Sequence, residues 1–149
     1  MSAGQQRIVV GIDGSEQSKA ALRWAIEQAR LTGAAVDAVT AWRFPASYGL
    51  SVVAADLDVE GEATKMLSET VADVVRGTSE VPIRQLAGEG PPAEVLLNTA
   101  KGADLLVVGS RGRGGFTSAV LGSVSLACVL HATCPVLVFR DEREDGGAM

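Results

Sequence analysis

The sequence lacks the features that indicate a nucleic-acid or membrane protein. Its net charge is −5 at pH 7, so it has no excess of Lys and Arg that would attract a polyanion. It contains no run of about 18 apolar residues, and the polar stretch from Met1 to Arg7 has no apolar signal-peptide core. We therefore expect a cytoplasmic protein without a nucleic-acid or membrane partner.

Residues that carry covalent and acid–base chemistry are also scarce. The chain has one histidine, His131, and two cysteines, Cys128 and Cys134, whose separation is unlike that of common zinc sites. Two thiols in a reducing compartment are typical of structural residues rather than of a disulfide. His131 falls near the end of the last predicted helix, where a structural role is favoured over that of a general base. No nucleophile with a base partner can be named, so no catalytic residues are predicted.

The composition predicts one folded domain over residues 1–149. Of its 149 residues, 47% are hydrophobic and 21% are charged, which is typical of a globular protein and excludes disorder of its body. A chain of this length buries one core and needs no second domain. We expect the core to span residues 7–140, and the charged, then glycine-rich tail 141–149 to be frayed.

Lysine is absent after Lys101, which excludes a Walker A loop from the glycine-rich stretch Asp104–Ser125. A dinucleotide fingerprint is also excluded, because the first turn reads Gly11-Ile12-Asp13-Gly14-Ser15. The stretch begins with a buried-strand run, Leu105–Val108, and a helical pattern follows its loop. Glycines let backbone N–H groups approach an anion, and a helix N-terminus attracts one. This combination predicts a phosphate site, although a glycine loop after a strand is often only a tight connection.

The spacing of the glycines is more specific than their number. Gly109 is followed after two residues by Gly112, and after nine more by Gly122-Ser123. Gly122 lies within the helical pattern, where glycine costs about 1 kcal/mol relative to alanine, which indicates a close approach to the backbone. This spacing, followed by the run Cys134–Val138, resembles the signature of the ATP-binding branch of the universal stress protein family. The resemblance extends from Ile8 to Arg140.

The apolar pattern predicts strands that alternate with helices. The strands are expected at 7–13, 35–41, 82–87, 105–108 and 135–140. The helices are expected at 16–31, at 59–76, from the Pro91-Pro92 turn to residue 100, and after the glycine loop. The irregular stretch 42–57 is a candidate flap over a ligand. This alternation predicts a doubly wound, Rossmann-like α/β sheet with helices on both faces, and the resemblance implies the strand order 3-2-1-4-5.

Ligands of such sheets bind beyond the carboxyl ends of the strands, where the strand order reverses. The end of the first strand supplies the candidates Gly11, Ile12, Asp13 and Ser15. Asp13 is expected to contact ribose or to hold Mg²⁺ through the phosphates, whereas helix capping is the alternative role of Asp13 and Ser15. The resemblance implies that backbone groups of Ala41 receive adenine, and Gly88 is a weaker candidate for the same wall.

The phosphates are assigned to the glycine loop and to the start of the following helix. The loop residues are Gly109, Ser110, Arg111, Gly112, Arg113, Gly114 and Gly115, and the helix residues are Gly122, Ser123, Val124 and Ser125. Exposed loop arginines are usually solvated. Backbone amides are therefore expected to matter more than the guanidinium groups.

The resemblance implies an ATP-binding stress-response protein in which the nucleotide is a structural or signalling ligand with at most slow hydrolysis. The residues do not distinguish ATP from AMP, ADP or cyclic AMP. Two alternatives are an adenine-nucleotide hydrolase or transferase of the related α/β class and a nucleotide-free dimeric interaction module. This sequence lacks the Ser-Gly-Gly-x-Asp-Ser loop that enzymes of the first class usually have after the first strand. A nucleotide-free module would have lost the glycine spacing, which is intact here.

The last strand predicts a homodimer. Residues 136–139 are apolar on both faces, and in the implied order this strand lies at a sheet edge without a lysine or internal proline to protect it. Antiparallel pairing of strand 136–140 with its copy would satisfy that edge, and the resemblance implies the same arrangement. Coverage by the tail or by the stretch 42–57 is the alternative.

Overall fold

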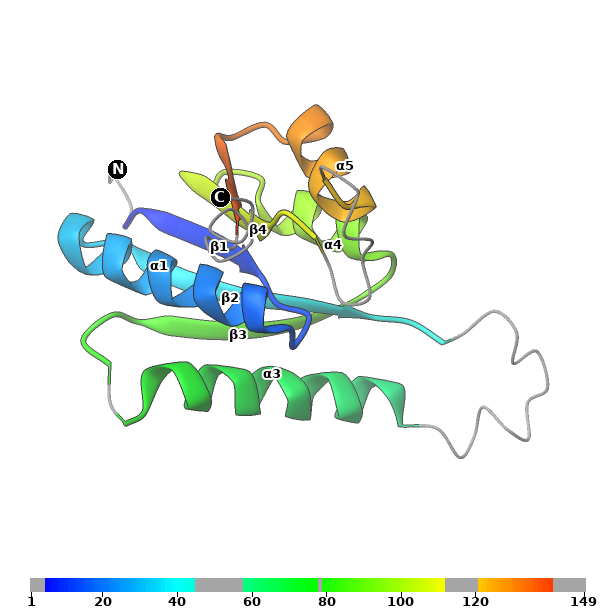
Figure 1. The fold of residues 1–149 in the computed structure, drawn as a ribbon, viewed down its shortest axis with the longest axis horizontal. Coiled ribbons are helices and arrows are strands. Elements are labelled where there is room, and N and C mark those ends of the chain that lie inside the picture. The colour runs from blue at the N-terminus through cyan, green and yellow to red at the C-terminus, as the bar shows by residue number, and fades with distance from the viewer. Residues whose placement is uncertain (1–4, 45–57, 78, 112–120, 141–149) are drawn as a thin grey trace, which may run out of the picture.

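The computed structural model describes residues 5–44, 58–77, 79–111 and 121–140, which form a parallel sheet between two layers of helices (Figure 1). The strands are β1 (Arg7–Gly11), β2 (Ala35–Trp42), β3 (Ile83–Glu89), β4 (Leu105–Gly109) and β5 (Val136–Phe139). The helices are α1 (Glu16–Thr32), α3 (Val59–Val75), α4 (Pro92–Thr99) and α5 (Ser123–His131). The sheet order β3-β2-β1-β4-β5 confirms the predicted doubly wound α/β fold.

The two faces of the sheet contribute to separate cores because successive strand residues point in opposite directions. Val10 and Val36 pack with α1 and α3, whereas Val9 and Val39 pack with α4 and α5. Residues on both faces are buried, which explains why β1 and β4 read as continuous apolar runs. The helices therefore clamp the sheet and hold its strand ends in fixed relative positions.

The turn from β1 into α1 is short and capped. Ser15 is the N-cap of α1, and its hydroxyl accepts a hydrogen bond from the Ser18 N–H at 3.1 Å. Gly33 ends the same helix in the left-handed region, at φ 83°. Because β1 and β4 are neighbours, the turn from β1 into α1 lies beside the end of β4.

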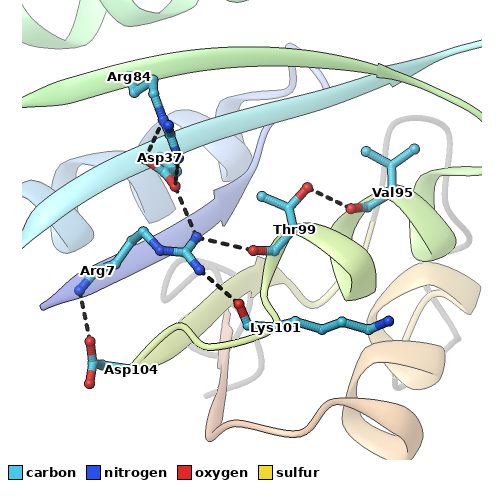
Figure 2. A network of polar contacts seen from close by, with 7 residues as sticks. All are labelled: Arg7, Asp37, Arg84, Val95, Thr99, Lys101 and Asp104. Atoms are coloured by element: carbon cyan, nitrogen blue, oxygen red, sulfur yellow. Dashed lines mark hydrogen bonds and ion pairs between the residues drawn. The ribbon is translucent and has the colours of Figure 1, made fainter. Parts of the chain in front are cut away.

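A charged network ties the sheet together near the amino ends of its strands (Figure 2). Asp37 of β2 is only 2% exposed and accepts hydrogen bonds from Arg7 at 3.0 Å and from Arg84 at 2.9 and 3.2 Å. Arg7 also donates to the carbonyl oxygens of Thr99 and Lys101, at 3.0 and 2.8 Å. The network thus links β1, β2, β3 and the connection from α4 to β4.

The element boundaries differ from the predicted ones at a few strand ends. β1 ends at Gly11, two residues before the predicted end, so Asp13 lies in the turn to α1. β2 extends through Trp42, and β3 extends to Glu89, two residues beyond the predicted end. Of the candidate flap predicted at 42–57, only residues 42–44 are described, and Trp42 belongs to β2. The predicted glycine-loop residues 112–115 and the frayed tail at 141–149 lie outside the described residues. Among the described helices, none has both the length and the apolar character needed to span a bilayer.

Candidate functional site

A cavity of about 640 Å³ opens beyond the carboxyl ends of β1, β2 and β4. This volume is within the range of about 300–1,000 Å³ that is typical of small-molecule pockets. It lies where the sheet order reverses, which is the position at which doubly wound sheets bind ligands. The described lining residues are Gly11, Ile12, Asp13, Ser15, Ser18, Val39, Thr40, Ala41, Pro92, Leu96, Val108, Gly109, Arg111, Leu121, Gly122, Ser123, Val124 and Ser125.

The cavity brings together most of the described residues that the sequence predicts for the site. From the end of β1 come Gly11, Ile12, Asp13 and Ser15, and from β2 comes Ala41. Gly109, Arg111 and the start of α5 complete this set. The described lining does not include Ser110 or Gly88, and the predicted residues Gly112 to Gly115 lie outside the described ranges.

Asp13 has a capping role that does not conflict with ligand contact. Its Oδ1 accepts a hydrogen bond from the Ser15 N–H at 2.9 Å, which supports the turn into α1. A carboxylate can accept about four hydrogen bonds, so capping and ligand contact are compatible. Among the described residues, no three His, Cys, Asp or Glu side chains converge on a metal position. A cation at Asp13 would therefore need further ligands, such as phosphate oxygens.

One wall of the cavity is apolar. Val39, Ala41, Leu96 and Val108 contribute to it from β2, α4 and β4. Val39, Leu96 and Val108 belong to the core cluster on the α4 and α5 face of the sheet, and Ala41 packs against it. Such a wall suits a flat, weakly polar ring, with polar groups remaining for its edges.

The base of the glycine loop is closed by Ser110. Its carbonyl oxygen accepts the Gly122 N–H at 2.6 Å and the Ser125 hydroxyl at 3.0 Å, which joins the two ends of the loop. Its N–H donates to the Phe139 carbonyl oxygen at 2.9 Å. Ser110 is buried, so its role in this structure is to anchor the loop rather than to line the cavity.

The α5 N-terminus directs backbone donors toward the cavity. Ser123, Val124 and Ser125 form its first turn, where N–H groups have no carbonyl partner within the helix, and all three residues line the cavity. The placement of Gly122 within a helix was wrong. Gly122 is the N-cap, with extended φ −73° and ψ 168°, so glycine carries no helix-interior penalty there.

Two predicted glycines are explained by packing of α4. A β-carbon on Gly88 would lie 2.8 Å from Val95 Cγ1, and one on Gly11 would lie 3.0 Å from Leu96 Cδ1. Gly88 is the next-to-last residue of β3 and is paired with Ala41 of β2. Its lack of a side chain thus lets α4 approach the sheet, and the same holds for Gly11, which also lines the cavity.

Sequence reasoning missed Gln17, Pro92 and Leu96. Gln17 binds the Arg111 N–H and the Ser110 hydroxyl, and the other two residues line the cavity from α4. A signal for Gln17 exists in the topology, because neighbouring β1 and β4 must place the first turn of α1 beside the loop after β4. The α4 residues follow from the same topology, since α4 covers the cavity face of the sheet.

The two thiols and the histidine are not part of the described cavity lining. Cys128 and Cys134 are free, as predicted, and burial raises the pKa of Cys128 to about 11, so this thiol is not activated. His131 is exposed at the last residue of α5, outside the described lining. The described lining residues thus offer binding groups rather than a nucleophile paired with a base.

A comparison of the chain with protein-family models matches residues 5–140 to the "Universal stress protein family". The chain belongs to the universal stress protein family. Universal stress protein Rv2005c of Mycobacterium tuberculosis is 38% identical over 139 residues, which cover 89% of this chain and 45% of that protein. The chain thus spans about half the length of the curated universal stress proteins that it matches.

Solved universal stress protein structures share the fold. Universal stress protein UspA from Lactobacillus plantarum has a TM-score of 0.76 and 25% identity, with 93% of this chain and 100% of that chain covered. A universal stress protein crystallised in complex with cAMP has a TM-score of 0.69 and 26% identity, with 89% and 95% covered. The family and the predicted strand order are therefore confirmed.

Proposed function

We propose that this chain is a stress protein that binds ATP as a structural or signalling ligand, with at most slow hydrolysis. The observation that carries the proposal is a single cavity lined by both the Asp13 turn and the first turn of α5. The first offers a carboxylate for ribose or Mg²⁺, and the second offers N–H groups and a helix dipole for phosphates. A universal stress protein 26% identical to this chain was solved in complex with cAMP, which supports an adenine nucleotide.

The parts of the nucleotide are assigned by chemistry. Adenine lies against the apolar wall, with backbone groups of Ala41 at its edge. The phosphates lie at Gly122, Ser123, Val124 and Ser125 and at the loop residues Gly112 to Gly115. The backbone amides of Ser110 and Arg111 already donate to Phe139 and Gln17. The amides that donate to the phosphates are therefore expected from the other assigned residues. AMP, ADP and cyclic AMP fit the same assignment with fewer phosphate contacts.

A thermal denaturation series with and without Mg-ATP tests the proposal. At about a hundredfold excess over a micromolar Kd, ATP stabilises the fold by about 2.7 kcal/mol, or roughly 5 to 10 °C in Tm. Nucleotide carried through purification is first removed and identified by chromatography of the denatured protein. An unchanged Tm at millimolar ATP in nucleotide-free protein would contradict the proposal.

Two substitutions separate geometry from charge. Gly122→Val adds a bulky side chain at a cavity-lining residue and should abolish ATP binding. Arg113→Ala should weaken binding by no more than about 1 kcal/mol, the value of a screened surface charge. Calorimetric titration measures both affinities. Loss of binding in the arginine variant alone would show that charge, and not backbone geometry, decides phosphate binding.

We also infer a homodimer that pairs β5 with its copy. β5 is at the edge of the described sheet, where a free row of backbone groups invites another strand. Beside it, α5 exposes a row of three apolar residues, the α5 flank: Leu126, Val129 and Leu130, which are 46%, 46% and 65% exposed. Antiparallel pairing about a two-fold axis perpendicular to the sheet would place both copies of α5 on the same face. The α5 flank would then be available to bury against the partner.

A further inference from the structure

The side chain of Gln17 joins two segments of the chain at the mouth of the glycine loop. Its Oε1 accepts a hydrogen bond from the Arg111 N–H at 2.9 Å, and its Nε2 donates to the Ser110 hydroxyl at 3.2 Å. Gln17 belongs to the first turn of α1, whereas Ser110 and Arg111 follow β4. One carboxamide therefore connects the Asp13 turn with the start of the loop.

The carboxamide also packs against the backbone where β4 ends. A β-carbon on Gly109 would lie 2.6 Å from Gln17 Oε1 and 3.2 Å from its Cγ and Cδ. The space beside Gly109 is thus filled by Gln17. The described lining of the cavity includes Gly109 and Arg111 but not Gln17. Gln17 thus contacts two lining residues without belonging to the described lining itself.

The neighbouring anchors do not replace this contact. Ser110 is held by Phe139 of β5 and by Gly122 and Ser125 at the start of α5, and these bonds persist without Gln17. The Arg111 N–H, by contrast, would lose the carboxamide as its acceptor. Gln17 therefore holds the backbone at Arg111.

We propose that Gln17 is a positioning residue for the phosphates of the bound nucleotide. The inference rests on the proposed nucleotide function, which places the phosphates in the cavity that Gly109 and Arg111 line. Gln17 acts through the backbone of Arg111 and does not touch the ligand. Its loss weakens ATP binding and leaves adenosine binding unchanged, since adenosine has no phosphate to misplace.

The test compares Gln17→Met with the control Gln28→Met in calorimetric titrations with ATP and with adenosine. Methionine keeps the length of the side chain and removes both hydrogen bonds, and Gln28 is a glutamine of the same helix that lies outside the described lining. Gln17→Met should lower ATP affinity about fivefold to tenfold, the value of one or two hydrogen bonds, with adenosine affinity within about twofold. Gln28→Met should change neither affinity.

Amide hydrogen exchange gives a readout without ligand. In Gln17→Met the Arg111 amide should exchange faster while the Ser110 amide stays protected by Phe139. Gln17→Glu retains an acceptor for the Arg111 N–H, so the Arg111 amide should stay protected in this variant. The glutamate variant also tests the inference if the methionine variant does not fold.

The possible results separate this inference from the proposed function. If the unmodified protein binds ATP and Gln17→Met binds ATP and adenosine with unchanged affinities, or loses both equally, the inference fails alone. An Arg111 amide whose exchange is indifferent to Gln17 would also overturn it. If the unmodified protein binds no nucleotide, the proposed function fails and the phosphate role of Gln17 fails with it.

Discussion

Gly109 and Gln17 are packed so closely that only glycine fits at the end of β4 without displacing the glutamine. A β-carbon on Gly109 would lie 2.6 Å from Gln17 Oε1, well inside van der Waals contact. The sequence assigns Gly109 to the phosphate through its loop spacing. Its lack of a side chain instead makes room for the residue that holds Arg111.

Gly109→Ala should therefore reproduce the effect of Gln17→Met. The new methyl group pushes the carboxamide away and breaks its hydrogen bonds to Ser110 and Arg111. Each single variant should lower ATP affinity several-fold, and the double variant should be little worse than either one, because both remove the same contacts. A double-mutant cycle measured by calorimetry checks this, and simple additivity would contradict the shared mechanism.

Asp37→Asn should destabilise the fold by about 2 kcal/mol, because it removes a buried charge that two arginines neutralise. Urea unfolding followed by circular dichroism measures the change. Asp73→Asn is the matched control, since Asp73 is half exposed and pairs with Lys19 on the surface. Its unfolding midpoint should stay within error of the unmodified protein.

The two arginines of the network should not be equivalent. Arg7 also donates to the Thr99 and Lys101 carbonyl oxygens, so Arg7→Gln breaks the link to the connection after α4. Arg84 contacts Asp37 from a side chain that is 63% exposed. Arg7→Gln should shift the urea midpoint further than Arg84→Gln, and the reverse order would show that the carbonyl contacts contribute little.

The parallel sheet could be predicted from the sequence because burial on both faces of a strand produces a short run of consecutive apolar residues. Val9 and Val10 point to opposite faces and are both buried, which produces the unbroken apolar run of β1. Asp37 interrupts the corresponding run in β2. Its partners are Arg7 and Arg84, which lie 30 and 47 residues away, so local periodicity does not predict the network.

The candidate site was predicted where a residue acts through its own position in the chain. Asp13 follows the end of β1 and Ala41 is the next-to-last residue of β2, and any doubly wound sheet brings those strand ends to one edge. The roles of Gly88 and Gln17 depend instead on side-chain packing between elements, and the role of Gly122 depends on where α5 begins. Gly88 accommodates Val95, and Gly122 begins α5 rather than interrupting it.

The stability of the fold should decline at alkaline pH because of Cys128. Burial raises the pKa of this thiol from its ordinary 9.0 to about 11, so the unfolded chain releases the proton first. The stabilising contribution is complete below pH 9 and is lost as the pH rises toward 11. Between these values, Cys128→Ala should lose less unfolding free energy than the unmodified protein in urea titrations. Parallel pH profiles would exclude this linkage.

The α5 flank provides a test of the proposed dimer that leaves the core intact. Leu137 and Val138 of β5 pack against the two cores of the protomer, so a lysine at either position would disturb folding as well as association. Leu130 is 65% exposed and belongs to neither core cluster. Leu130→Lys therefore reports on the interface alone.

In a dimer paired through β5, Leu130→Lys should place like charges near each other on one face of the joined sheets and raise the dissociation constant at least tenfold. Leu31→Lys is the matched control, because Leu31 is 69% exposed on α1, which covers the other face of the sheet. Sedimentation velocity at tens of micromolar measures the assembly, and circular dichroism confirms that both variants fold. A monomeric unmodified protein would rule out the dimer, whereas a dimer unaffected by Leu130→Lys would place the interface away from the α5 flank.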